Sequence, residues 1–388
     1  MPHLEISSEV SMYYEIVSSE PNNPWLLLIH PFISNFSVIK DFAEQPVIKS
    51  MFNCILFEMR YHGRTRAPLS AKLDRHTFAT DLAMGMQKLQ LPPVHVIAGQ
   101  ANTSEVALAL AAIFPEKVLS IFLCGLGPDL YSEATEAAFH ECIQCIVFPA
   151  DQEQWEEGMN ELHYIHFHED TNVAREDEMR VIDEWTDILI KRYSPRKASL
   201  ITALGMVEMG RQPTPQAFLD SLTQPLFICH GAASTVMTEA ESFERYLTYP
   251  NLDLRSKFES IPGAPLVLLP LYTPLLTEKY VAWIRPILED RGQTDPQPSI
   301  SDFTKSLNRL ATLYDKPSIA DRDPFESSSY HVIDENSYED REMKLAGVKM
   351  AEKEAILLPG EEAPESWTDA SQDEKTPWRF TKRFEAQM

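Results

Sequence analysis

Residues 94–111, "VHVIAGQANTSEVALALA", are the stretch that decides the fold. Val94–Ala98 is a short, mostly apolar run, which predicts a buried strand. Gly99 starts a sharp turn, and the segment Ser104–Ala112, rich in Ala, Leu and Val, predicts a helix. The result is a strand, a tight turn and a helix in direct succession, with Ala101 at the tip of the turn.

The same alternation continues on both sides of this unit. Continuous apolar runs predict strands buried on both faces at Trp25–His30, Phe52–Phe57, Val118–Cys124, Pro225–His230 and Leu254–Ile261. Helical patterns separate them at Ile33–Phe42, His76–Leu89, Thr238–Leu247 and Thr277–Leu288. Strands that alternate with helices at this spacing predict a mostly parallel sheet with right-handed crossovers. Weak alternation over residues 3–17 predicts an antiparallel hairpin at its edge.

Two segments break this alternation. Residues 131–222 show only helical patterns, which predicts an all-helical cap inserted into a core formed by residues 1–130 and 223–290. Residues 291–388 are rich in Asp, Glu, Ser and Pro and predict an acidic tail with little order. Two parts of the tail stand out: a candidate charged helix at Tyr338–Ile356 and the aromatic and basic stretch Trp378–Phe384.

Composition restricts the partners. The net charge of −24 disfavours nucleic acid and anionic membrane surfaces, because both repel an acidic protein. No apolar run reaches the roughly 18 residues of a membrane span, and the first residues lack a basic start and an apolar core, so we expect a cytoplasmic protein. Five scattered cysteines, with one isolated C-x-x-C at Cys142 and Cys145, favour free thiols. We predict neither a cofactor nor a metal; the stretch His163–Glu169 fits the end of a cap helix better than a metal site.

Five segments in order resemble landmarks of the α/β-hydrolase superfamily, in its branch with a helical cap. They are "LLLIHPF" (26–32), "FEMRYHGRTRAP" (57–68), the 94–111 unit with the strand that follows it, "QPLFICHGAAST" (224–235) and "FESIPGAPLVLLPL" (258–271). The resemblance implies a nucleophile elbow G-x-S-x-G at the strand-turn-helix unit. Its five positions are held by Gly99, Gln100, Ala101, Asn102 and Thr103.

The resemblance also shows that the three catalytic positions are substituted. The nucleophile position is Ala101, the acid position is Ser234 and the histidine position is Leu266. Ala101 and Leu266 can neither attack a substrate nor transfer a proton. The family's oxyanion hole uses backbone amides, here those of Phe32 and Asn102, which side-chain changes do not remove. The polar residues expected beside the pocket are His30, Gln100 and His230.

Three functions remain open at this point. The first is a non-hydrolytic protein that binds a small hydrophobic molecule, or a protein partner, through the pocket, the cap or the tail. The second is a cofactor-free lyase, isomerase or cyclase acting on a carbonyl compound, with His30 and His230 as candidate proton-transfer groups. The third is hydrolysis of an ester, lactone or epoxide. A pocket filled by side chains would exclude a small ligand, and turnover that survives loss of both histidines would exclude the second function.

Overall fold

An eight-stranded sheet forms the centre of the protein in a computed structural model, which describes residues 3–167, 176–250, 254–291, 297–356 and 358. The strand order is β1-β2-β4-β3-β5-β6-β7-β8. The strands are β1 (His3–Glu5), β2 (Ser11–Val17), β3 (Trp25–Ile29), β4 (Asn53–Phe57), β5 (Val94–Ala98), β6 (Val118–Cys124), β7 (Leu226–Gly231) and β8 (Lys257–Ile261). β1 and β2 are antiparallel and the other six are parallel, which confirms the predicted α/β fold and its edge hairpin.

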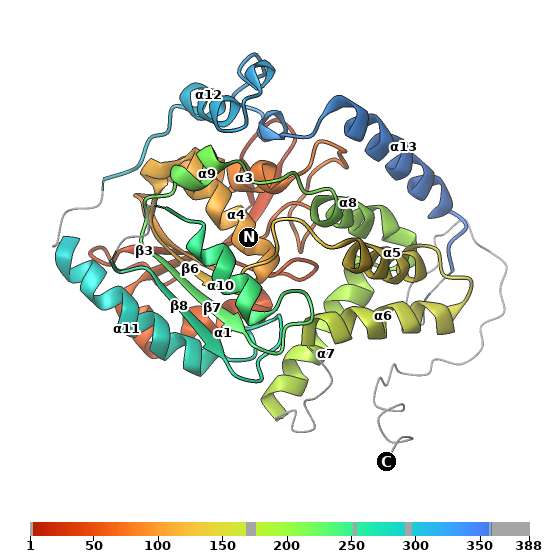
Figure 1. The fold of residues 1–388 in the computed structure, drawn as a ribbon, viewed down its shortest axis with the longest axis horizontal. Coiled ribbons are helices and arrows are strands. Elements are labelled where there is room, and N and C mark those ends of the chain that lie inside the picture. The colour runs from red at the N-terminus through yellow and green to blue at the C-terminus, as the bar shows by residue number, and fades with distance from the viewer. Residues whose placement is uncertain (1–2, 168–175, 251–253, 292–296, 357, 359–388) are drawn as a thin grey trace.

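Helices cover both faces of this sheet. They are α1 (Ser37–Glu44), α2 (Pro46–Met51), α3 (Arg75–Lys88), α4 (Ala101–Ile113), α10 (Glu239–Leu247) and α11 (Thr273–Arg291). Alternate residues of β3 point into different cores: Leu27 packs with residues of α3 and α4, and Leu28 packs with residues of α1 and α11. Figure 1 shows these two helix pairs on opposite sides of the strands. Burial on both faces explains why the central strands are continuous apolar runs.

A helical insert, residues 131–222, separates β6 from β7. It contains α5 (Glu133–Val147), α6 (Gln152–Phe167), α7 (Glu176–Arg192), α8 (Ala198–Met209) and α9 (Gln216–Asp220), so its predicted helical character is confirmed in the described part. Its buried side chains, Trp155 and Trp185 among them, join the core on the α3–α4 side of the sheet. Among the described helices, none is both long and apolar enough to span a membrane.

The prediction that residues 291–388 have little order is wrong for residues 297–356. They form α12 (Phe303–Leu313), short 3-10 turns at Pro317–Ile319 and Ser327–Tyr330, and α13 (Glu335–Ala351). Leu310, Ile319 and Tyr330 are fully buried in the α3–α4 core. The acidic composition gave the wrong prediction because the acidic side chains are on the surface, while a small number of apolar residues pack into the core. A helix is present where Tyr338–Ile356 was predicted, but it begins at Glu335 and ends at Ala351, and Trp378–Phe384 lies outside the described residues.

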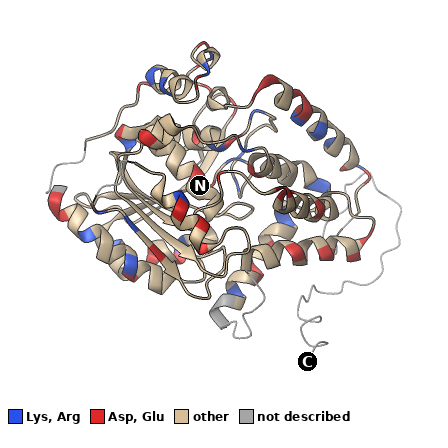
Figure 2. Cartoon of the chain, viewed as in Figure 1, with Lys and Arg blue, Asp and Glu red and all other residues tan. Residues whose placement is uncertain are grey.

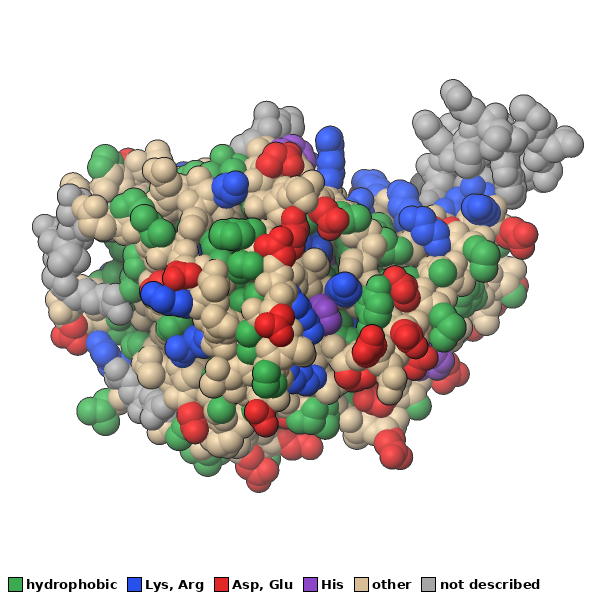
Figure 3. Space-filling model, turned by 90° about the horizontal axis from the view of Figure 1, so that it is seen from above, with side chains coloured by type: hydrophobic (Ala, Val, Ile, Leu, Met, Phe, Trp, Pro, Cys, Tyr) green, Lys and Arg blue, Asp and Glu red, His purple; other side chains and the backbone are tan. Residues whose placement is uncertain are grey.

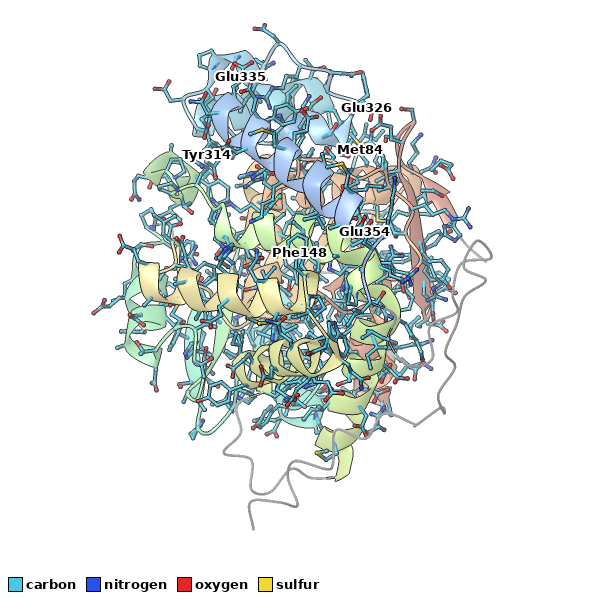
Figure 4. The ribbon with its side chains drawn as sticks, turned by 90° about the vertical axis from the view of Figure 1, so that its right-hand side faces the viewer. Met84, Phe148, Tyr314, Glu326, Glu335 and Glu354 are labelled. Atoms are coloured by element: carbon cyan, nitrogen blue, oxygen red, sulfur yellow. The ribbon has the colours of Figure 1, made fainter. Side chains whose placement is uncertain are left out.

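The C-terminal segment, residues 297–356, joins the core to the helical insert. Arg341 of α13 donates hydrogen bonds to the Leu73 carbonyl, just before α3, and to the Met206 and Gly210 carbonyls at the end of α8. Figure 4 shows α13 crossing this side of the molecule, with Glu335 and Glu354 towards its two ends. Seen from the side of α12, acidic and basic side chains are interspersed over the surface (Figure 3).

Candidate functional site

The turn between β5 and α4 brings three chain segments into close contact. A Cβ on Gly99 would lie 3.2 Å from the Ile29 carbonyl oxygen, a tight contact that a larger residue could make only if its neighbours shifted. Gly125, which follows β6, has φ +98°, and a Cβ at this position would lie 3.2 Å from the Ala101 Cβ. Ala101 begins α4 and is only 1% exposed. The tip of the turn is therefore packed beneath its neighbours.

The loops after β7 and β8 lie beside this turn. Gln100 forms an isolated antiparallel bridge with Val267, which places Leu266 next to the elbow. The Ala233 amide donates to the Ala264 carbonyl at 2.9 Å, so the turn that carries Ser234 is bonded to the loop that carries Leu266. The structure thus brings the segments of Ala101, Ser234 and Leu266 together at one edge of the sheet.

Comparisons with known proteins agree with this arrangement. A family model for the alpha/beta hydrolase fold matches residues 24–144. A thermophilic esterase from Thermogutta terrifontis is similar in structure, with 17% identity and a TM-score of 0.59 over 74% of this chain and 99% of the esterase. The chain is an α/β-hydrolase-fold protein.

Two further solved structures share this α/β-hydrolase fold. An enol-lactonase from Burkholderia xenovorans LB400 has 12% identity and a TM-score of 0.58, over 73% of this chain and 99% of the lactonase. A structure from a study of carboxylesterases of Nitrososphaera gargenis has 18% identity and a TM-score of 0.60, over 74% of this chain and 100% of that structure's chain. No curated protein matches the sequence. Because these structures match over nearly their whole length, roughly a quarter of this chain has no counterpart in them.

The position of the α/β-hydrolase oxyanion hole is occupied by the protein's own side chain. The Phe32 amide donates a hydrogen bond of 3.1 Å to Oε1 of Gln100, and the Gln100 side chain is fully buried. The Phe32 amide, predicted to be available, is therefore not open to a ligand in this structure. The second predicted amide, that of Asn102, lies in the first turn of α4. One of the two amides expected to form an oxyanion hole is therefore bonded to Gln100 in this structure.

Buried charges surround the first turns of α4. The Glu105 carboxylate lies 2.8 Å from Arg75 and 2.7 Å from Arg245. Burial alone would raise the pKa of Glu105, but the guanidinium groups of Arg245 and Arg75 lower it below its ordinary value. Glu105 is thus a paired carboxylate rather than a free general base.

The same charge cluster links α4 to the helical insert. Arg211, just after α8, forms an ion pair with Glu208 and donates to the Pro128 carbonyl at 2.8 Å. Asp129 accepts the amide proton of Thr214 at 3.1 Å. Asp129 thereby fixes the strand-to-insert connection to the segment after α8. These bonds keep the insert closed against the core.

The cavity beside the first turn of α4 is very small. A cavity of about 20 Å³ remains, which is enough for about one water molecule. Phe32 and Asn102 line it from the core, Arg211 from the insert, and Val332 and Ile333 from the C-terminal segment. The position of a substrate pocket is thus filled by side chains from three parts of the chain.

The two predicted histidines differ in their surroundings, because in the described part of the chain backbone groups hold both ring nitrogens of His30 but not those of His230. His30 accepts from the Met59 amide at 3.1 Å through Nε2, and its Nδ1 lies 2.8 Å from the Pro31 carbonyl. Burial lowers the pKa of His30 to about 4, so it is neutral at physiological pH. His230 is buried at the end of β7, its ring stacks on Phe258, and burial lowers its pKa. Neither histidine lines the cavity.

In the stretch expected to be the end of a cap helix, His166 bonds to the Leu162 carbonyl at 2.7 Å and His163 to Thr186 at 2.9 Å, whereas His168 and Glu169 lie outside the described residues. The residues that shape the site most, Arg75, Glu105, Arg211 and Arg245, were not predicted. One signal was present in the sequence: Glu105 is a single charge within the apolar helix "SEVALALAAI". Its partners come from distant segments and could not be read from the chain.

Proposed function

We propose that this chain is a non-hydrolytic α/β-hydrolase-fold protein that acts by binding a protein partner rather than by converting a substrate. The observation that carries the proposal is the packing of Ala101, with its neighbours, where the fold would present a nucleophile. Acyl transfer needs a nucleophile, a base and an oxyanion site. Here Ala101 holds the position of the nucleophile and Leu266 that of the base. The Phe32 amide, expected in the oxyanion site, is bonded to Gln100.

The small size of the elbow cavity disfavours a small hydrophobic ligand at that position, which leaves a protein partner as the favoured interpretation. Sites for small molecules usually measure about 300–1,000 Å³, and the cavity beside the elbow measures about 20 Å³. The bonds of Arg211 and Asp129 would have to break before a metabolite could enter. Rewritten chemistry also has weak support, since His30 is held by two backbone groups and neither His30 nor His230 lines the cavity.

Fluorophosphonate labelling and ester turnover test the proposal. We would compare the wild type, Ala101→Ser and the Thermogutta terrifontis esterase as a positive control. We expect labelling of the esterase alone, because a serine at position 101 would have neither a base nor space for the reagent. Labelling or turnover by repurified wild-type protein would overturn the proposal, since it would require a nucleophile elsewhere in the site.

A further inference from the structure

The helices α5 and α6 form a hairpin with an open groove on its surface. The groove measures about 760 Å³, within the range of ligand-binding sites. Its apolar lining includes Ala138 and Phe139 of α5, Ile165 of α6 and Val236 from the loop after β7. This groove lies apart from the elbow cavity: the two have no lining residue in common.

The groove is also acidic. Glu141, Glu157 and Glu161 line it, and none of the three forms an ion pair with a described residue. The whole hairpin, residues 132–167, carries eight carboxylates and no lysine or arginine. Figure 2 marks acidic positions in red along α6. An apolar groove bordered by unpaired carboxylates fits a segment that presents aromatic and cationic side chains together.

The chain contains such a segment near its end. Residues 375–384, "KTPWRFTKRF", combine four basic residues with three aromatic ones and have no acid. Residues 360–374, immediately before them, carry six acids and no base, so the charge along the tail is sharply divided. The acidic part is repelled by the hairpin and the basic part is attracted to it.

The described chain ends close enough for this contact. Glu352 bonds to the Ser199 amide at 2.7 Å, which fixes the end of α13 beside α8, and α8 packs against α5. In Figures 1 and 4 the end of α13, near Glu354, lies next to the turn between α5 and α6, near Phe148. The 17 residues from Leu358 to Lys375 span up to about 55 Å when extended. The 16-residue helix α6 is only about 24 Å long.

We propose that residues 375–384 of this chain occupy the acidic groove of the α5–α6 hairpin. Trp378, Phe380 or Phe384 fills its apolar part, and Arg379, Lys382 and Arg383 pair with Glu141, Glu157 and Glu161. The tail then covers this open groove of the helical insert, and a partner with a similar basic and aromatic segment competes with it. This proposal concerns a surface outside the elbow site and stands whether or not the protein is hydrolytic.

Zero-length carbodiimide cross-linking of the full-length protein tests the contact, because it joins lysines to carboxylates that touch. An equal mixture of ¹⁴N- and ¹⁵N-labelled protein separates links within one chain from links between copies. We expect Lys375 or Lys382 to link to Glu141, Glu157 or Glu161 within one chain. Lys279 and Glu259, which lie 2.5 Å apart, provide the internal positive control. Links to other carboxylates only, links between copies only, or no links beside a positive control would each overturn the proposal.

Hydrogen exchange on full-length variants gives a second readout. Glu157→Gln/Glu161→Gln removes two groove charges, and Glu136→Gln/Glu153→Gln removes two charges from the same hairpin outside the groove lining. We expect the amides of residues 378–384 to exchange roughly four-fold faster in the first variant, since it removes two exposed ion pairs and each contributes a factor of about two. The second variant should match the wild type. Equal exchange in both variants would overturn the proposal.

Discussion

Arg341→Met tests whether the C-terminal segment is a structural part of the fold. The guanidinium group donates to the carbonyls of Leu73, Met206 and Gly210 at 2.9, 2.9 and 3.0 Å. Hydrogen bonds from a charged donor contribute about 1.5–3 kcal/mol each. Burial lowers the pKa of Arg341, which means that desolvation of the charge offsets part of that sum. Methionine keeps most of the apolar packing, so we expect a net loss of about 2–4 kcal/mol in the free energy of unfolding.

Urea unfolding, followed by far-UV circular dichroism, measures this loss. The matched control is Lys344→Met, which removes the same charge from an exposed position of the same helix and should stay within about 0.5 kcal/mol of the wild type. Limited proteolysis should also cut Arg341→Met faster between α12 and α13, because local detachment of α13 exposes this connection. Equal unfolding midpoints and equal cleavage rates for the two variants would refute the reasoning.

Three further predictions concern other parts of the molecule. Asp81→Ala should lower the free energy of unfolding by about 3–5 kcal/mol, measured by chemical denaturation, because it leaves buried Arg60 without the carboxylate 2.6 Å away. Adding Arg60→Met should recover part of this loss. Gly158→Ala should lower the melting temperature, since its Cβ would lie 2.8 Å from the Cys145 Cβ, whereas Gly347→Ala, with nothing within 4 Å, should raise stability by up to about 1 kcal/mol. Burial holds the pKa values of four histidines at about 4, below the ordinary 6.5: His30, His163, His166 and His331. Because the unfolded chain then binds protons more readily than the folded one, the free energy of unfolding should fall as the pH drops from 6.5 to 4. Urea midpoints at pH 7 and pH 5 should reveal this loss, about 1–2 kcal/mol per histidine, and His166→Gln should reduce it; a pH-independent midpoint would contradict the assignment.

The strands were predictable because their signal is local. Val94–Ala98 and Val118–Cys124 have the same bounds in the sequence interpretation and in the structure, since a strand buried on both faces is a continuous apolar run between turn residues. The C-terminal segment was missed because its acidic composition outweighed a weaker pattern. Phe303, Leu307 and Leu310 do recur at helical spacing, and they pack against residues of α4.

The geometry of the elbow site could be predicted only in part. The order of the landmarks identifies the segments that meet, and the Gln100–Val267 bridge agrees with that register. The sequence does not reveal where a side chain points, so the bond from the Phe32 amide to Gln100 was not foreseen. The pairing of Glu105 with Arg245 was also hidden, because it joins residues 140 positions apart that no local pattern connects.

The C-terminal segment also has a consequence for the order of synthesis. Arg60 pairs with Asp81 but also donates to the Ser327 hydroxyl at 2.7 Å, and Asp74 accepts the Val332 amide proton at 2.8 Å. At about 5–20 residues per second, the ribosome needs roughly 10–50 s to pass from the codon for Asp81 to that for Val332. During this interval the nascent sheet carries buried polar groups whose last partners have not yet been made. The N-terminal part of the sheet, which is synthesised first, therefore cannot finish folding until the C-terminal segment has been made, and until then it is held on the ribosome or by a chaperone.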